Sequence, residues 1–338
     1  MQRACGTSLE TTMNIANKIA LGQIESGIAG GVYSISDAPI VFSDGLRKIL
    51  LSSASGKSLI SKIKPWLRMK LNYLKPKLPG VKEPRTGLSM GESTEIIAKK
   101  YDISRSSQDQ LAFKSHLNAA SAYENGFYDD LIESYKDIHQ DNLIRKNPSL
   151  DKLGSLKTVF DKSNNGTMTP GNSTSLTDGA AAVLLSSEEW ARSNDLNIKA
   201  FLSHIEIAAI DYINDEGLLM APAYAVSNML KKANLSLQDF DFYEIHEAFA
   251  AQTLATLKVW ESDEFCRSKL NRESAMGSID SAKINVKGGS LAIGHPFAAT
   301  GARIVGTMAK LLNEKGSGRG LISICTAGGM GITAIMEK

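Results

Sequence analysis

Cysteine is scarce in this chain. Its 338 residues include three cysteines, Cys5, Cys266 and Cys325. An odd and sparse set provides no disulfide framework and indicates a reducing compartment. Long apolar runs are also missing, since none reaches the roughly 18 residues of a membrane-spanning helix. The first residues lack the charged and apolar segments of a secretory signal. We therefore expect a cytoplasmic protein rather than a secreted or membrane-spanning one.

Charge of one sign does not dominate the chain. The net charge is +2, and 43% of the residues are apolar against 22% charged. This balance is typical of a globular protein with two domains and a sizeable core, and it gives no sign of nucleic-acid binding. The spacings of structural zinc sites, Cys-x-x-Cys and His-x-x-x-His, do not occur. We expect neither a nucleic-acid partner nor a metal site.

Basic residues are concentrated in one segment, residues 43–86. This segment carries a net charge of +9, which leaves −7 for the rest of the chain. Apolar residues at helical spacing alternate with its lysines and arginines. Such a segment can lie on an anionic membrane surface or meet an acidic partner. The alternative is the solvated face of an ordinary packed helix, and the sequence leaves the choice open.

The hydrophobic pattern predicts an α/β protein with a largely parallel sheet. A domain boundary is expected near 196/197, with 1–196 and 197–338 as the two halves and 37–160 as an insertion in the first. The predicted helices span 5–21, 92–101, 106–125, 222–233 and 296–315, with shorter ones ending near 190 and opening at 246. The predicted strands span 26–32, 180–186, 200–210, 240–245, 284–286, 320–325 and 332–336.

One arrangement occurs twice. Cys5 opens a helix that leads to a strand and a Gly-Gly pair, and His295 opens a helix followed by the same order. The two halves therefore look like versions of one βαβ plan. Each places a reactive residue at a helix start, where α/β sheets bind ligands.

Four residues at loop or helix-start positions have side chains suited to catalysis. Cys5 stands at a helix N-terminus, where free N–H groups favour the nucleophilic thiolate. His295, in a glycine-rich turn, can exchange a proton near neutral pH. Cys325 ends a strand before a glycine turn and suits an acid/base role beside an oxyanion site. His246 follows a strand. The plainer alternative for both histidines is capping of local backbone.

Together these segments resemble the thiolase superfamily over the whole chain. The matching runs are Cys5-Gly6-Thr7-Ser8, Leu176 to Ala182, His246-Glu247-Ala248-Phe249-Ala250, Gly288 to Arg303, and Cys325 with its glycine turn. Most thiolases have asparagine where His246 stands. The histidine, together with the basic insertion, resembles the thiolase (β) subunit of fatty-acid-oxidation trifunctional complexes.

The resemblance implies a thiolase-like fold of two βαβαβαββ halves with an inserted loop domain. It implies a 3-oxoacyl-CoA thiolase, in which Cys5 takes the acyl group, His295 and Cys325 transfer protons, and His246 holds a water in one oxyanion hole. The backbone N–H groups of Cys5 and Ala327 would form the other. Contacts to coenzyme A, a substrate rather than a cofactor, fall on Ala327, Gly328, Ser290 and His204. The implied assembly is a homodimer that binds a hydratase/dehydrogenase α subunit.

The family pattern has a long segment before the nucleophile, which this sequence does not include. We expect the N-terminal half to retain one helix and two strands, around 5–32 and 180–186, and to expose apolar strand edges. An inactive truncated fragment is therefore one alternative, and an acetoacetyl-CoA thiolase (acetyl-CoA C-acetyltransferase) is another. A condensing ketoacyl synthase is a third, but such enzymes pair one cysteine with two histidines, so Cys325 favours a thiolase.

Overall fold

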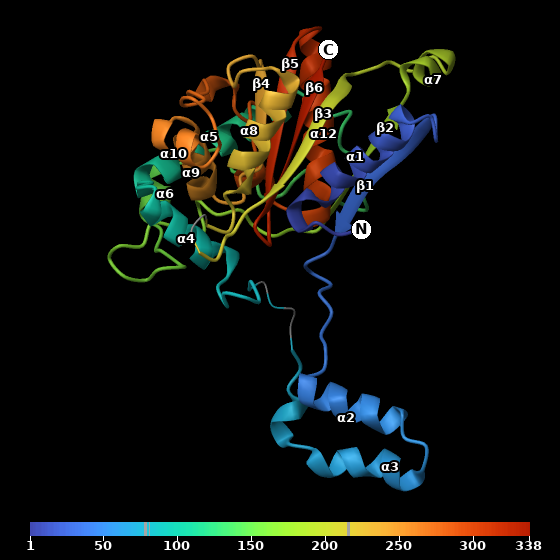
Figure 1. Ribbon diagram of the computed structural model, residues 1–338. Coiled ribbons are helices and arrows are strands. Elements are labelled where there is room, and N and C mark those ends of the chain that lie inside the picture. Colours follow the sequence, from blue (N-terminus) through green and yellow to red (C-terminus); the bar gives the residue numbers. More distant parts are fainter. Residues whose placement is uncertain (78–79, 81, 215–216) are drawn as a thin grey trace. The chain divides into compact units, whose positions relative to one another are not determined.

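The computed structural model describes residues 1–77, 80, 82–214 and 217–338 (Figure 1). They form two compact units. The main unit comprises Met1–Tyr33 and Glu83–Lys338, and the inserted unit comprises Ser34–Lys82. The predicted insertion 37–160 is thus divided, because its residues from Glu83 onward belong to the main unit.

The main unit alternates helices and strands. Its helices are α1 (Thr7–Ala20), α4 (Met90–Lys100), α5 (Arg105–Glu124), α6 (Leu150–Gly154), α7 (Glu188–Ser193), α8 (Ala221–Ala233), α9 (Ala250–Trp260), α10 (Asp263–Ser268), α11 (Ser290–Ile293) and α12 (Thr300–Lys315), with 3₁₀ turns η1 (Ala4–Gly6), η4 (Ser281–Lys283) and η5 (Phe297–Ala299). Its strands are β1 (Ser26–Tyr33), β2 (Gly179–Ser186), β3 (Phe201–Ala209), β4 (Phe242–Ile245), β5 (Arg319–Thr326) and β6 (Met330–Glu337).

The strands form two sheets, one of β1 and β2 and one ordered β3-β6-β5-β4. The prediction of a largely parallel sheet is wrong. Among the strand pairs of the described residues, β4–β5 is parallel, whereas β1–β2, β3–β6 and β5–β6 are antiparallel. A three-residue turn joins β5 to β6, and so short a connection permits only antiparallel pairing. The predicted strand at 284–286 is reduced to one bridge between Ile284 and Tyr243.

Two helices lie between the sheets. α12 contacts β1 and β2 on one side and β4 and β5 on the other, and α1 packs against α12 and the β1–β2 pair (Figure 1). α8 covers the side of the larger sheet formed by β3 and β6. The predicted repeat is therefore present in three dimensions, because α1 leads to the pair β1–β2 as α12 leads to β5–β6. The starts of α1 and α12 meet between the sheets, and this meeting point positions the candidate site.

Polar residues at the helix ends set the boundaries. Ser89 and Glu92 form a capping box at α4, and the Ser104 hydroxyl accepts from the Ser107 N–H at α5. Such caps satisfy N–H groups that have no partner within the helix. α12 ends at Gly316 with a φ of 82°, a left-handed conformation that glycine adopts without steric cost. These local signals explain why the predicted helix boundaries agree with the structure to within a few residues.

The inserted unit is small and helical. It contains α2 (Asp44–Ala54), α3 (Leu59–Ile63) and the 3₁₀ turns η2 (Lys64–Arg68) and η3 (Leu71–Leu74). Among the large apolar residues of this unit that the structure describes, only Leu46 and Ile49 of α2 are buried. Most of the others are exposed, namely Ile40, Val41, Phe42, Leu51, Leu59, Ile60, Ile63, Trp66, Leu67, Leu71 and Leu74. Across the described residues, no helix combines the length and apolar character needed to cross a bilayer.

Candidate active site

Cys5 lies in the 3₁₀ turn that precedes α1 and is 7% exposed. The residue before it, Ala4, has a φ of 41°, a left-handed conformation that is costly for a residue with a side chain. The strained residue turns the chain into α1 and directs the Cys5 sulfur between the sheets. Gly6 follows because a Cβ there would lie 2.7 Å from Ile332 and 2.9 Å from Thr326.

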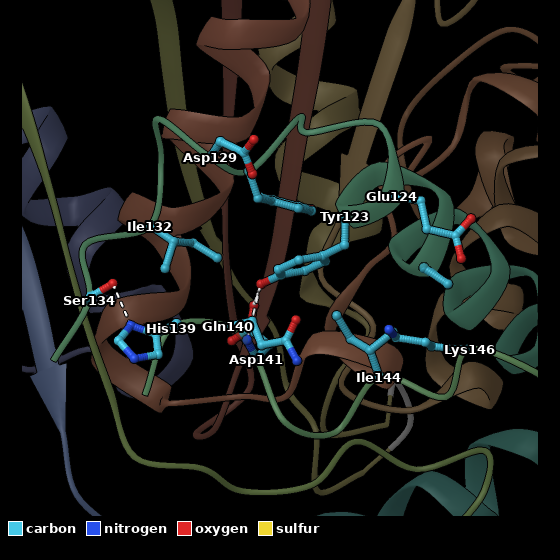
Figure 2. Close-up of a pocket in the computed structure, with 12 residues that line it drawn as sticks. Tyr123, Glu124, Asp129, Ile132, Ser134, His139, Gln140, Asp141, Ile144 and Lys146 are labelled. Carbon is cyan, nitrogen blue, oxygen red and sulfur yellow. Dashed lines mark hydrogen bonds between the residues drawn. The ribbon is translucent and has the colours of Figure 1, made fainter. Parts of the chain in front are cut away.

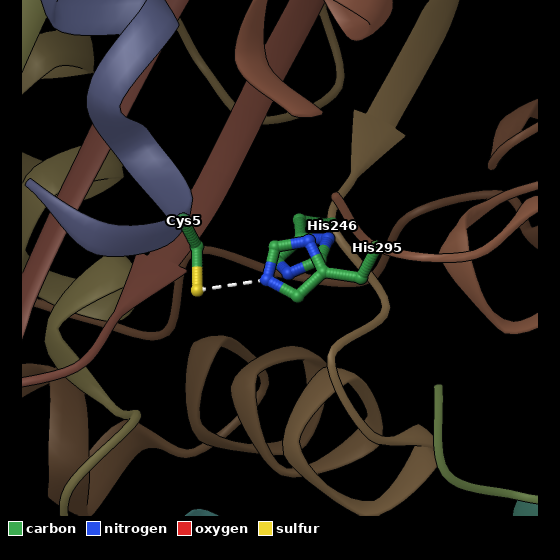
Figure 3. A group of neighbouring side chains, drawn as sticks. All are labelled: Cys5, His246 and His295. Carbon is green, nitrogen blue, oxygen red and sulfur yellow. Dashed lines mark hydrogen bonds between the residues drawn. The ribbon is translucent and has the colours of Figure 1, made fainter. Parts of the chain in front are cut away.

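His295 faces Cys5 across this space. Its Nε2 lies 3.0 Å from the Cys5 Sγ, and its Nδ1 lies 2.7 Å from the Thr300 Oγ1 at the start of α12 (Figure 3). The backbone of His295 pairs with residues 175–177, which fixes the loop from the other side. If Nδ1 carries the proton and donates to Thr300, Nε2 is free to accept the proton of the cysteine. The pair thus has the geometry of a nucleophile and its general base.

Burial controls the protonation of this pair. It raises the pKa of the Cys5 thiol to about 12, although the backbone N–H groups of Cys5 and Ala327 act in the opposite direction. Burial, aided by the Arg303 charge, lowers the pKa of His295 to about 3. The N–H groups thus favour the thiolate, as expected, but desolvation outweighs them. The resting pair is a neutral thiol beside a neutral imidazole.

Cys325 ends β5 and is 1% exposed. Its sulfur lies 3.4 Å from the Gln252 Oε1 on α9, so the thiol donates to this amide. Burial raises the pKa of Cys325 well above its usual range, and a negative charge on Cys5 raises it further. A thiol with a raised pKa is a weak acid, and its thiolate is a strong base.

His246 lies directly after β4, and its ring packs against that of His295 with centroids 4.2 Å apart (Figure 3). Its Nδ1 lies 2.8 Å from the Ser290 Oγ, whereas its Nε2 is buried without a hydrogen-bond partner among the described residues. The helix predicted to open at His246 begins at Ala250 instead. Glu247 is therefore not a first-turn charge; it is buried and hydrogen-bonded to Ser115, Asn285 and the Leu291 N–H.

Two backbone N–H groups, those of Cys5 and Ala327, are directed at the Cys5 sulfur. Paired N–H groups at a nucleophile can stabilise an oxyanion that forms beside it. Ala327 and Gly328 follow β5 in the turn to β6; Ala327 is half-buried and Gly328 is exposed. Their predicted contact with coenzyme A stays a prediction, at a position open to a ligand.

The other two predicted coenzyme A contacts, Ser290 and His204, also stay predictions. Ser290 is fully buried, and its hydroxyl bonds to His246 and Arg303. His204 pairs with Ile335 on β6, four residues from Gly331, the partner of Cys325. That offset is about 13 Å of strand, so a contact of His204 would fall on a part of coenzyme A distant from its sulfur.

Cys5, His246 and His295 also form a set that could approach a metal ion, since one ligand atom of each lies within 4.8 Å of the others. Zinc bonds of about 2.0–2.3 Å require ligand atoms closer together than that upper spacing. The short contact between Cys5 Sγ and His295 Nε2 already joins two of the atoms that a metal would need. The geometry suits proton transfer better than metal binding.

A cavity of about 400 Å³ lies elsewhere in the main unit and contains none of these four residues. Figure 2 shows the Tyr123 hydroxyl pointing at Asp141, to which it donates over 2.6 Å. His139 is exposed and lines this cavity. His116 is 6% exposed and accepts the Arg145 N–H, and burial lowers its pKa to about 4.

Three residues of the site carry no sequence signal of their own. Thr300 orients His295, Gln252 accepts from Cys325, and the Arg303 guanidinium donates to Ser290 over 2.9 Å. Thr300 and Arg303 fall inside a motif that the sequence analysis quoted, although their contacts could not be foreseen. Gln252 lies in the first turn of α9, and only the tertiary fold brings it to Cys325.

Comparisons with known proteins all match thiolases, and the matches extend over the entire chain. The family model described as thiolase, N-terminal domain, matches residues 1–189, and that described as thiolase, C-terminal domain, matches residues 196–338. A 3-ketoacyl-CoA thiolase of Yersinia pestis is 43% identical over 343 aligned residues, which span 100% of this chain and 78% of the relative.

Two solved structures have the same fold. The acetyl-CoA acetyltransferase of Bacillus anthracis superimposes with a TM-score of 0.78 at 30% identity, over 100% of this chain and 78% of the other. The human mitochondrial 3-ketoacyl-CoA thiolase in complex with CoA superimposes with a TM-score of 0.78 at 29% identity, over 100% and 77%.

Proposed function

This chain belongs to the thiolase family and is an acyltransferase that acts on acyl-CoA; from this premise we propose how its residues cleave a 3-oxoacyl-CoA with coenzyme A. The products are acetyl-CoA and an acyl-CoA shortened by two carbons, as in fatty-acid β-oxidation. The observation that carries the proposal is the 3.0 Å contact between Cys5 and His295, with Cys325 buried at the end of β5.

In the first half-reaction the Cys5 sulfur attacks the 3-keto carbon while its proton passes to His295 Nε2. The oxyanion that forms accepts hydrogen bonds from one of the two donor groups, either the backbone N–H pair or the histidines with a bound water. The bond between carbons 2 and 3 then breaks. The acyl group stays on Cys5 as a thioester, and the acetyl-CoA carbanion takes the proton of Cys325. A covalent intermediate divides one difficult step into two easier ones.

In the second half-reaction the Cys325 thiolate removes the proton of the coenzyme A thiol. The coenzyme A sulfur attacks the thioester carbonyl, and the Cys5 sulfur leaves and recovers its proton from His295. All three groups return to their starting states. Because Cys5 is a thiol at rest, proton transfer accompanies attack rather than preceding it.

Thiolysis assays test this function. The protein is incubated with coenzyme A and either acetoacetyl-CoA or a longer 3-oxoacyl-CoA, and acetyl-CoA is measured. Cleavage of the longer substrate supports the proposal. Cleavage of acetoacetyl-CoA alone supports the second candidate, an acetyl-CoA C-acetyltransferase, which the likeness to the Bacillus anthracis enzyme favours. An inactive fragment would cleave neither substrate.

We further propose that the inserted unit binds an anionic membrane surface. Its exposed apolar residues stand among exposed basic side chains, including Lys62, Lys64, Arg68 and Lys70. An apolar face with a basic rim is the combination that anchors a helix in a charged lipid interface. Each basic residue near such a surface contributes about 1 kcal/mol.

Vesicle sedimentation distinguishes a membrane from a protein partner. We expect binding to vesicles that contain phosphatidylserine and little binding to pure phosphatidylcholine. Reversing Lys62, Lys64, Arg68 and Lys70 to glutamate should abolish binding without changing thiolysis. If the wild type binds neither kind of vesicle, the membrane proposal is wrong, and an acidic protein partner becomes the better explanation of the basic segment.

The remaining proposals concern assembly and location. We propose a homodimer that binds a hydratase/dehydrogenase α subunit in the cytoplasm. The three cysteines, all free and buried, support a reducing compartment. On the β1–β2 sheet, Ile28 and Leu184 are paired and both exposed, together with Val32 on the same face. This exposed apolar face supports contact with another protein surface, and light scattering of the purified protein measures the mass of the assembly.

A further inference from the structure

A buried chain of hydrogen bonds leads away from His246. His246 Nδ1 contacts the Ser290 Oγ over 2.8 Å, and the same oxygen accepts from Arg303 Nη2 over 2.9 Å. His246 is 1% exposed and Ser290 is fully buried. This chain of hydrogen bonds joins the end of β4, the first residue of α11 and the first turn of α12. Ser290 and Arg303, the two residues behind His246, have no role in the mechanism above.

The directions of these hydrogen bonds follow from chemistry. A guanidinium has no acceptor, so Arg303 can only donate to Ser290. A serine hydroxyl has one proton of its own, and its two partners among the described residues are His246 and Arg303. That proton must therefore point to His246 Nδ1, which accepts it. The ring proton of a neutral His246 then sits on Nε2.

The opposite tautomer would leave one more buried group unsatisfied. If His246 Nδ1 donated to Ser290, the serine proton would have no acceptor, whereas Nε2 has no partner among the described residues in either tautomer. Each unmade bond of a buried group disfavours a state by a factor of roughly ten or more. The ring also stays neutral, since burial, a positive charge on His295 and the Arg303 charge lower the pKa of His246 well below its usual range.

His246 Nε2 is the end of the chain that faces the reaction. It has no partner among the described residues, and the ring stacks on His295 beside Cys5. We propose that Arg303 and Ser290 are positioning residues that hold His246 as its Nε2–H tautomer and so present one N–H donor to the oxyanion site. The inference about the oxyanion rests on the proposed thiolase function, whereas the tautomer itself does not.

Arg303 adds a charge as well as a hydrogen bond. Its positive charge lowers the pKa values of groups on several neighbouring segments. These groups are both histidines and Tyr123, Tyr128, Asp141, Glu244 and Glu247. Burial raises the pKa of Glu244 to about 8, so this neighbour does not fully neutralise the arginine at pH 7. A positive charge two hydrogen bonds behind an N–H donor strengthens that donor toward an anion.

Two serines in the same region provide a matched comparison. Ser290 and Ser323 are both buried, but the Ser323 hydroxyl has no hydrogen-bond partner among the described residues. Ser290→Ala removes the proposed proton donor to His246, and Ser323→Ala removes a hydroxyl of the same size that donates to nothing described. Any difference between the two variants therefore reports the bond rather than the loss of a buried oxygen.

The tautomer is read directly from ¹⁵N NMR of labelled histidine side chains, with His246→Asn to identify the signals. In the wild type and Ser323→Ala we expect the proton of His246 on Nε2; in Ser290→Ala we expect a mixture or the opposite tautomer. A wild-type proton on Nδ1, or spectra that Ser290→Ala leaves unchanged, overturns the proposal. This measurement needs no turnover, so it stays informative if the thiolase assignment fails.

Kinetics test the link to the oxyanion. Loss of one oxyanion donor lowers kcat by about 10²- to 10³-fold. Ser290→Ala should lose the Nε2–H tautomer only in part, so we expect its kcat to fall about tenfold or more while its KM stays nearly unchanged. Arg303→Lys keeps the charge and a donor and should retain more activity than Arg303→Met. If Arg303→Met preserves both kcat and the His246 spectrum, Arg303 has no part in the chain. Unchanged kcat in Ser290→Ala refutes the catalytic role.

Discussion

Gly301 controls the distance between α1 and α12, the helices that follow Cys5 and His295. It lies in the first turn of α12 where that helix crosses α1. A Cβ at this position would overlap the Leu9 backbone nitrogen and lie 2.9 Å from the Ser8 Oγ. The same Ser8 oxygen accepts from the Ala302 N–H over 2.7 Å, so the two helices are bonded at the point of contact. Gly301→Ala therefore forces α1 and α12 apart.

The magnitude follows from ordinary contact distances. Restoring a normal van der Waals separation requires a shift of about 0.5–1 Å between the helices. Overpacking of this kind costs about 1–3 kcal/mol of stability. A misplacement of about 1 Å at the reacting atoms can cost about 10²-fold in rate. Because the shift acts on the 3.0 Å contact between Cys5 and His295, we expect kcat to fall about a hundredfold.

Gly306 on the same helix is the control, because a Cβ there would meet nothing within 4 Å. Gly306→Ala should stabilise α12 by about 0.5–1 kcal/mol through helix propensity and leave kcat unchanged. Thermal unfolding and thiolysis of a 3-oxoacyl-CoA measure both effects in both variants. If Gly301→Ala matched Gly306→Ala in stability and kcat, the spacing between the helices would not govern the site.

Three further predictions concern the site. Cys325→Ala should lower kcat by about 10²- to 10⁴-fold, as expected for a lost general acid and base, whereas Cys266→Ala, buried in α10, should retain activity in the same assay. His295, with a pKa lowered to about 3 against 6.5 for an unfolded histidine, contributes stability that is present above pH 6.5 and lost as pH falls toward 3. From pH 7 to pH 5, urea unfolding of the wild type should therefore lose about 2 kcal/mol more than His295→Asn, and the opposing effect of Glu244 is common to both proteins. Dialysis against EDTA should leave thiolysis unchanged, and loss of activity restored by zinc would contradict the metal-free mechanism.

The sequence predicts the local structure well, since that structure has local causes. The capping-box pattern at Ser89, the glycine after α12 and the apolar run of β2 are readable without tertiary information. The predicted first helix and the predicted strands at 26–32 and 180–186 are present as α1 and the pair β1–β2. Strand direction was harder to predict, because the pattern of apolar residues in a strand does not state which way its neighbour runs.

The candidate site also has features that the sequence predicts and features that depend on the tertiary structure. Cys5, His246, His295 and Cys325 stand in recognisable motifs, and the structure brings them together. Their protonation could not be predicted, because desolvation depends on everything packed around Cys5 rather than on its place before a helix. The burial of Ser290 and the register of His204 likewise depend on contacts with residues far along the chain.

The neutral state of Cys5 affects how the protein withstands oxidants. Peroxides and simple alkylating agents react with thiolates far faster than with thiols. A sulfur that is 7% exposed and whose pKa is raised to about 12 offers them little reactive form. An acyl donor bound beside His295 instead creates the nucleophile at the moment of its use. The burial that makes Cys5 a weak acid thus serves as chemical protection between turnovers.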